Sequence, residues 1–149
     1  MEKFEKEKNA LRELFRVQKL CVLSTLNERH PYVNLIGFYV NDDLNEIIFA
    51  TYRSTRKFSN ITLNSNVSVL IDSRSNRDVD FQTAIAATAI GAAKEVSGNE
   101  RNRLQSLFLK KYPHLCDFVS SPDCALMRIK VERYIIVNEF QNVVEMKIK

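Results

Sequence analysis

Glycine, proline and cysteine are all scarce in this sequence. The 3 Gly and 3 Pro among its 149 residues exclude collagen-like, linker-rich and low-complexity structure. The 3 cysteines, Cys21, Cys116 and Cys124, form an odd and widely spaced set without a C-x-x-C pair. Reduced thiols are therefore expected, rather than disulfides or a zinc site. The 2 histidines, His30 and His114, lie far apart without metal-ligand spacing, so we predict no metal site.

Long hydrophobic runs are absent as well. The longest apolar stretch, Leu35–Val40, is far short of the roughly 20 residues that cross a bilayer. The first ten residues alternate charges where a signal peptide needs an apolar core. The sequence therefore predicts a cytoplasmic protein with no membrane partner. With 45% hydrophobic and 27% charged residues and no internal repeat, it predicts one folded domain, 1–149.

The hydrophobic pattern predicts many strands and few helices. Amphipathic periodicity indicates helices over 1–17 and 97–113, and a short helix over 54–63. Apolar and β-branched runs indicate strands over 20–26, 32–40, 46–50, 67–71, 83–96, 124–138 and 143–148. The order predicts a mainly β fold with peripheral helices, in which core strands over 20–96 are closed into a barrel by strands over 124–148.

Two local features test these assignments. Alanine dominates 83–96 although it favours helices, and we assign a strand there because strands flank it and Thr and Ile interrupt it. Ser97 and Glu100 have the spacing of a capping box, which predicts that the helix over 97–113 begins at Ser97.

Positive charge gathers after the third strand. The net charge is +4, no acidic residue occurs between Thr51 and Ile71, and Arg53, Arg56 and Lys57 fall within five positions. Helix N-termini carry partial positive charge, so cations in the first turn of the helix over 54–63 destabilise it. A dianion such as phosphate, bound by backbone N–H groups, hydroxyls and these cations, removes that cost. A solvated basic turn is the alternative.

Three segments in this region together resemble a known family. They are Ile47–Thr51, an apolar strand ending in Thr; Thr55–Lys57, which opens a helix; and Asn64–Leu70, an Asn-containing turn into an apolar strand. This succession resembles the pyridoxamine 5'-phosphate oxidase-like split-barrel flavoproteins. The resemblance covers about 20–96 and continues more weakly through residue 148.

The resemblance implies a six-stranded antiparallel split β-barrel that forms a homodimer with FMN at the subunit interface. It places the FMN phosphate on Thr51, Thr55, Arg56 and Lys57, and the isoalloxazine ring along the second strand and near Ala50. The cofactor-binding residues that it implies are Val33, Asn34, Leu35, Ile36, Ala50, Thr51, Thr55, Arg56, Lys57 and Gln82.

Departures from the family pattern argue against vitamin B6 oxidation. The oxidases carry an Arg and a Lys in the second strand, and 32–38 contains neither. Their Gln ahead of the later strand's Gly is replaced by Ala86, with Gln82 nearby, and no Arg-x-His signature follows His114. We therefore predict a smaller relative, an FMN-dependent oxidoreductase that acts on a small-molecule or nicotinamide electron donor. No catalytic side chain is assigned.

Other functions remain as alternatives. A non-catalytic flavin- or haem-binding protein is one, although haem needs an axial ligand and neither His30 nor His114 has supporting context. Nucleic-acid binding is disfavoured because three cations in one turn are few and no stacked-aromatic motif accompanies them. Arg74 and Arg77 lie in a polar stretch from which they can reach a neighbouring subunit, but a solvated loop is the preferred interpretation.

Overall fold

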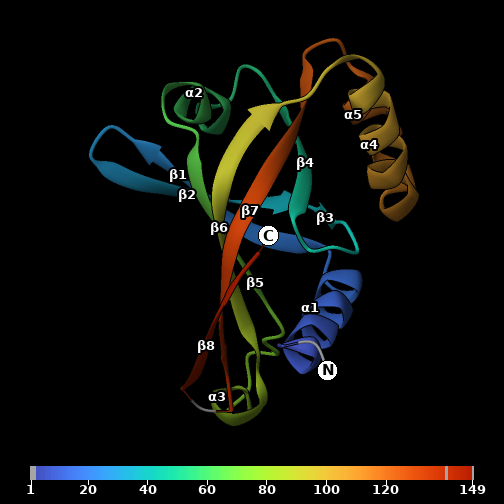
Figure 1. Ribbon diagram of the computed structural model, residues 1–149. Coiled ribbons are helices and arrows are strands. Elements are labelled where there is room, and N and C mark those ends of the chain that lie inside the picture. Colours follow the sequence, from blue (N-terminus) through green and yellow to red (C-terminus); the bar gives the residue numbers. More distant parts are fainter. Residues whose placement is uncertain (1–2, 140, 149) are drawn as a thin grey trace.

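The computed structural model describes residues 3–139 and 141–148 (Figure 1). Its helices are α1 (Glu5–Val17), α2 (Arg56–Leu63), α3 (Asp80–Thr83), α4 (Gly98–Lys111) and α5 (Cys116–Ser120), with a 3₁₀ turn at Pro113–Leu115. Its strands are β1 (Leu20–Asn27), β2 (His30–Gly37), β3 (Tyr39–Val40), β4 (Glu46–Tyr52), β5 (Asn66–Asp72), β6 (Ala86–Glu95), β7 (Cys124–Asn138) and β8 (Asn142–Lys147).

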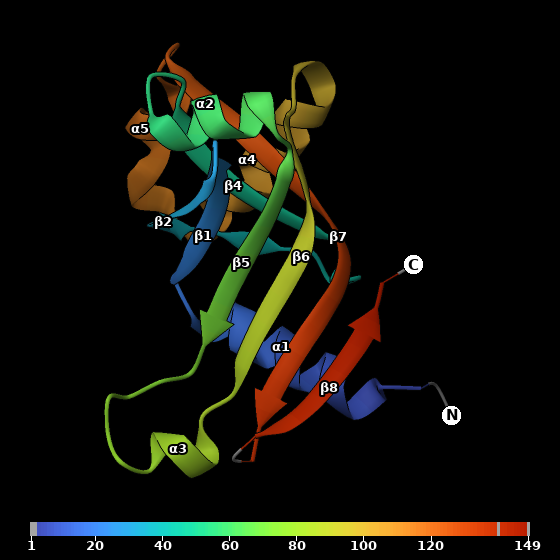
Figure 2. The same cartoon turned by 90° about the vertical axis from the view of Figure 1, so that its left-hand side faces the viewer.

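The strands form one antiparallel sheet that curls into a split barrel. Their order is β2-β1-β5-β6-β7-β4-β3, and β8 pairs with β7 outside this path. Because β2 pairs with β1 while β3 pairs with β4, the continuous segment 30–40 crosses from one end of the sheet to the other. The split barrel is confirmed, with β2 and β3 as two parts of one predicted strand and β8 as an added hairpin arm (Figure 2).

A bulge in β7 interrupts its regular pairing with β6. Strand β7 pairs with β6 along its length, with β4 over 124–130 and with β8 over 133–138. The register shifts because Gly91 pairs with Val131 while Ile90 pairs with Arg133, which leaves Glu132 as the extra residue. A Cβ on Gly91 would lie 2.1 Å from the Lys130 carbonyl oxygen, so only glycine permits this approach.

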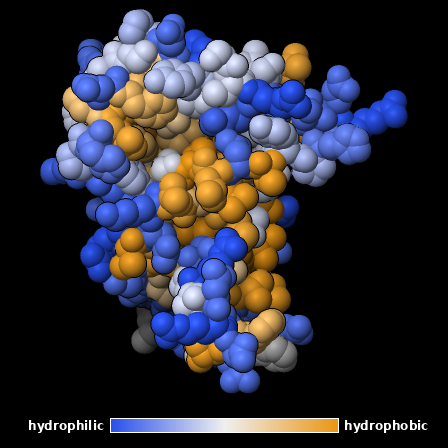
Figure 3. Space-filling model, turned by 180° about the vertical axis from the view of Figure 1, so that it is seen from behind, coloured by the Kyte–Doolittle hydropathy of each residue, from blue (hydrophilic) through white to orange (hydrophobic). Residues whose placement is uncertain are grey.

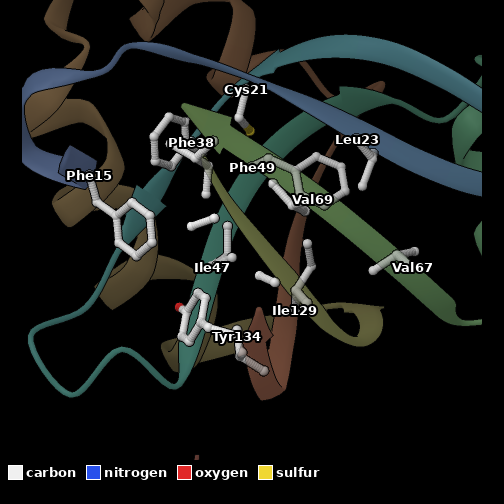
Figure 4. Packing of buried hydrophobic residues seen from close by; sticks show 14 of the residues in the cluster. Phe15, Cys21, Leu23, Phe38, Ile47, Phe49, Val67, Val69, Ile129 and Tyr134 are labelled. Carbon is white, nitrogen blue, oxygen red and sulfur yellow. The ribbon is translucent and has the colours of Figure 1, made fainter. Parts of the chain in front are cut away.

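Two hydrophobic clusters stabilise the fold. The larger lies inside the barrel and is covered at one end by α1 through Leu11, Leu14 and Phe15 (Figure 4). The smaller lies where α4 and α5 cover the outer side of β4 and β7, around Phe108 and Leu126. In the larger cluster the buried Tyr134 hydroxyl donates a hydrogen bond to the Leu44 carbonyl oxygen at 2.8 Å.

Some local predictions were wrong. Ser97 is the N-cap residue of α4, as predicted, but its side chain makes no cap hydrogen bond, and the Glu100 carboxylate accepts from Arg128 at 2.7 Å and Arg103 at 2.8 Å instead of completing a capping box. Helices α3 and α5 are not among the helices predicted from the sequence, and β6 begins at Ala86 rather than residue 83. None of the helices in the described part of the chain is long and apolar enough to span a membrane.

Candidate functional site

The turn between β4 and α2 is held by two threonine hydroxyls. Thr51 is 1% exposed, and its Oγ1 lies 2.8 Å from Oγ1 of Thr55, where either hydroxyl can donate. Thr55 also caps α2, since its Oγ1 accepts from the Phe58 N–H at 3.4 Å and donates to the Tyr52 carbonyl at 2.8 Å. The end of β4 and the start of α2 are therefore one rigid unit. The predicted helix is confirmed, although it begins at Arg56 rather than Ser54.

The first turn of α2 carries cations and no acidic residue. The exposed Arg56 places its guanidinium carbon 5.7 Å from the Tyr32 ring centroid on β2. Lys57 is half-buried, and this burial lowers its pKa. Within residues 3–139 and 141–148, neither Arg56 nor Lys57 forms an ion pair with a carboxylate. This end of the helix is thus an uncompensated positive region that favours a bound anion.

Arg53 does not belong to that positive region. Its guanidinium binds the Glu95 carboxylate through Nη2 at 2.5 Å and Nε at 3.3 Å, and donates to the Pro122 carbonyl at 2.8 Å. The three cations that appear together in the sequence are therefore divided. Arg53 ties the turn to β6 and the loop before β7, whereas Arg56 and Lys57 stay available for a ligand.

An open pocket of about 870 Å³ lies beside α2 and the β1–β2 turn. Its lining includes Thr55 and Arg56 among the predicted site residues, but not Thr51 or Lys57. On α2 the lining residues Arg56, Ser59, Asn60 and Leu63 follow the spacing of one helical face. Sequence reasoning missed Ser59 and Asn60 because only the apolar spacing of this helix was considered.

Asn60 anchors this helix to the barrel. It is 4% exposed, and its Nδ2 donates to Thr25 Oγ1 on β1 at 3.0 Å. A buried polar pair of this kind fixes the orientation of α2 relative to β1. The positions of Arg56 and Lys57 relative to the sheet consequently depend on Asn60 and Thr55 together.

Strand β2 presents a free edge and two kinds of side chain. Within the described residues it pairs with β1 on one side only, so the opposite backbone groups are open to a ligand. Val33 and Leu35 point outward and are 60% and 63% exposed, whereas Ile36 is buried. Asn34 alternates with them, and its Oδ1 is buried without a hydrogen-bond partner among the described residues. An enclosed acceptor without a donor is costly unless a ligand supplies one.

The remaining predicted residues are divided between the two ends of the molecule. Ala50 is half-buried on β4, next to Thr51. Gln82 lies in α3, which is at the opposite end of the barrel from α2 (Figures 1 and 2). A single chain therefore does not bring Gln82 to the first turn of α2, and its role as a cofactor contact stays a prediction that requires a second copy.

The structure resembles solved proteins with different ligands in their names. One is a haem binding protein from Mycobacterium smegmatis, with TM-score 0.79 and 15% identity, covering 91% of this chain and 57% of that one. Another is a FAD-binding protein from Mesorhizobium loti, with TM-score 0.71 and 14% identity, covering 86% and 90%. A third is HutZ, the haem storage protein of Vibrio cholerae, with TM-score 0.70 and 18% identity, covering 98% and 96%.

At these identities the likeness shows the fold alone, and this chain spans little more than half of the mycobacterial protein. No curated protein matches the sequence. The family model described as "Pyridoxamine 5'-phosphate oxidase" matches residues 8–138, which include every strand from β1 to β7. The split barrel and this match agree, and the chain belongs to the pyridoxamine 5'-phosphate oxidase family.

Proposed function

We propose that the protein binds FMN and acts as an FMN-dependent oxidoreductase on a small-molecule or nicotinamide electron donor. The observation that carries the proposal is the first turn of α2, where Arg56 and a half-buried Lys57 have no carboxylate partner among the described residues. The free N–H groups in the first turn of the helix add neutral donors, which suits a phosphate monoester.

The second strand fits the ring of the same cofactor. Strand β2 offers a free backbone edge, and the enclosed Oδ1 of Asn34 lacks a donor within the described chain. An isoalloxazine ring carries both acceptors and an imide N–H, so it can satisfy such groups. When bound, FMN would supply hydride or electron transfer, and the chain's own groups would bind, orient and shield it.

We further propose that two copies of the chain pair through the outer face of the sheet. The strand register places Leu35, Val22, Leu70, Thr88 and Ile135 in one row across five strands. Figure 3 shows hydrophobic residues gathered along the middle of this side of the molecule. This row includes the exposed Leu35 and lies beside the exposed Val33. An apolar band of this kind is typical of a subunit interface. In such a dimer, Gln82 of one copy would approach β2 of the other copy.

Haem binding is the second candidate, because two of the similar structures are named for haem. It has weaker support in this chain. His30 stands exposed at the start of β2 and His114 is exposed in the 3₁₀ turn after α4, so neither is enclosed as an axial ligand normally is.

The absorbance spectrum and the mass of the molecule that co-purifies with the protein test these candidates. Flavin absorbance with the mass of FMN supports the first proposal, and a Soret band supports haem. Consumption of NADH or NADPH with an electron acceptor distinguishes an enzyme from a carrier. A purified protein that cannot be loaded with FMN would overturn the flavin proposal.

The variant Arg56→Ala/Lys57→Ala tests the phosphate position. We expect it to weaken FMN binding by about 3–6 kcal/mol, since hydrogen bonds to charged groups contribute about 1.5–3 kcal/mol each. Arg53→Ala is the matched control, because this cation of the same turn binds Glu95 instead. FMN affinity unchanged in the double variant, or reduced as much by Arg53→Ala, would show that the phosphate binds elsewhere.

A further inference from the structure

A second pocket lies apart from α2, between α1, α4 and the segment that joins β3 to β4. It measures about 570 Å³, a size typical of small-molecule sites. Figure 1 shows these three elements on the same side of the barrel, while α2 lies at its upper end. None of the residues that line this pocket also lines the pocket beside α2.

Lys111 sets the chemistry of this pocket. Its Nζ donates to the Phe15 carbonyl at 2.8 Å and the Phe38 carbonyl at 3.0 Å, and lies 4.0 Å from the Phe38 ring centroid. These contacts hold the ammonium group in one position and use two of its three protons. One N–H remains for a ligand.

No anion within the described residues balances this charge. Neither Lys111 nor the neighbouring Lys110 forms an ion pair among residues 3–139 and 141–148. Burial is the main cause that lowers the pKa of Lys111 to about 8, and the smaller effects of Cys21 and Lys19 oppose and reinforce this shift respectively. The carboxylate of Glu13, which also lines the pocket, is already bound by Arg16 through two hydrogen bonds of 2.7 and 3.1 Å.

Apolar groups form much of the remaining wall. Phe15 comes from α1, Val40 and Leu44 come from β3 and the segment after it, and Leu107 comes from α4. The site thus combines an enclosed cation with hydrocarbon surface. Arg12 and Arg16 also line the pocket, but Arg12 donates to the Asp42 carbonyl and to Asn9 Oδ1, and Arg16 binds Glu13. The free N–H of Lys111 therefore matches one carboxylate oxygen better than a phosphate dianion, which needs several donors.

We propose that this pocket binds a small monocarboxylate with an apolar body, whose carboxylate lies against Lys111 and Lys110. The apolar body lies against Leu44 and Leu107. This site is independent of the flavin site, because it shares no residue with α2 or β2.

Decanoate is a suitable probe, with decanol and decylamine as ligands of the same chain length and different charge. Isothermal titration calorimetry on the purified protein should detect one decanoate per chain and no binding of decylamine. We expect Lys110→Glu to weaken decanoate binding by about tenfold or more, because it puts a carboxylate at an exposed position on the rim. Lys94→Glu is the control, because it makes the same charge change at an exposed residue of β6 that does not line this pocket.

Lys111→Met should abolish binding if it folds, and Leu107→Trp should block the pocket without changing its charge. Circular dichroism shows whether each variant is folded. The proposal is overturned if decanoate does not bind in the millimolar range, or if decylamine binds as well as decanoate. It is also overturned if Lys110→Glu and Leu107→Trp bind decanoate like the unmodified protein. None of these outcomes depends on whether the flavin proposal is correct.

Discussion

The hydroxyl oxygens of Thr51 and Thr55, 2.8 Å apart, join the last buried position of β4 to the N-cap of α2. A change at either residue therefore affects the strand end and the helix start together. In this chain the cationic first turn of α2 begins at this junction.

Thr55→Val should destabilise the protein by about 1–2 kcal/mol, because the isosteric side chain can neither cap α2 nor bond to Thr51. Urea unfolding followed by circular dichroism measures the difference. Thr55→Ser keeps the hydroxyl and should cost much less. Equal losses in the two variants would mean that the methyl group, and not the hydroxyl, holds the junction.

Gly91→Ala should be among the most destabilising single changes in the sheet, at about 3 kcal/mol or more, because the new Cβ meets the Lys130 carbonyl at 2.1 Å. Gly37→Ala is the control. Its Cβ would find its nearest neighbour, Tyr112 Cζ, at 3.6 Å, which is an ordinary contact. Midpoints of thermal unfolding compare the two, and a Gly91→Ala protein as stable as Gly37→Ala would contradict the bulge geometry.

Cysteine reactivity should separate the three thiols. Cys116 is exposed, whereas Cys21 and Cys124 are buried. Burial raises the pKa of Cys21 to about 12 and also raises that of Cys124. At pH 8 we expect a disulfide reagent to modify Cys116 rapidly and the other two only after denaturation.

The raised pKa of Cys21 also predicts that the stability of the protein depends on pH. An unfolded Cys21 loses its proton from about pH 8.5 upward, while the folded thiol keeps it to about pH 12. The unfolded state then binds fewer protons, so the free energy of unfolding falls as pH rises above about 8.5. Cys21→Ala should show a weaker decline between pH 8.5 and 10. An identical pH dependence in both proteins would exclude a contribution from Cys21.

Leu35→Glu should shift the protein from dimer to monomer, because it places a charge in the apolar row that we propose as the interface. Light scattering after size exclusion measures the mass, and Leu35→Val is the apolar control. A protein that is monomeric before mutation, or a Leu35→Glu variant that stays dimeric, would show that this face does not pair the subunits.

Much of the fold was predictable from local patterns. Alternating and β-branched runs indicated the strands, and the Thr and Ile interruptions correctly favoured a strand over alanine's helix preference in β6. The wrong local predictions have tertiary causes. Glu100 has the spacing of a capping box, but Arg128 on β7 lies within 2.7 Å of it and withdraws it from Ser97. That arginine is close only in the folded chain.

The candidate site was predictable only in part, because local patterns indicate the turn but not its contacts with distant segments. Residue order indicated a cationic turn, and the helix that follows it is present. The sequence did not reveal that Glu95 removes Arg53 from this cluster, since 42 positions separate the two residues. Nor did it reveal that Asn60 bonds to Thr25, because a polar residue on a helix gives no sign of its partner. Contacts between distant segments decide which members of a charged cluster stay available for a ligand.

The extra residue in β7 also fixes which side chains face inward. Before Glu132 the inward residues are odd-numbered, including Ile129 and Val131, and after it they are even-numbered, Tyr134 and Ile136. Without the bulge, a regular β7 of the same residues would keep its odd-numbered side chains inward along its whole length, placing Arg133 and Ile135 among the core residues in place of Tyr134 and Ile136. The extra residue thus lets one long strand bury apolar side chains in both of its halves, and Gly91, which leaves room for the Lys130 carbonyl, is what permits it.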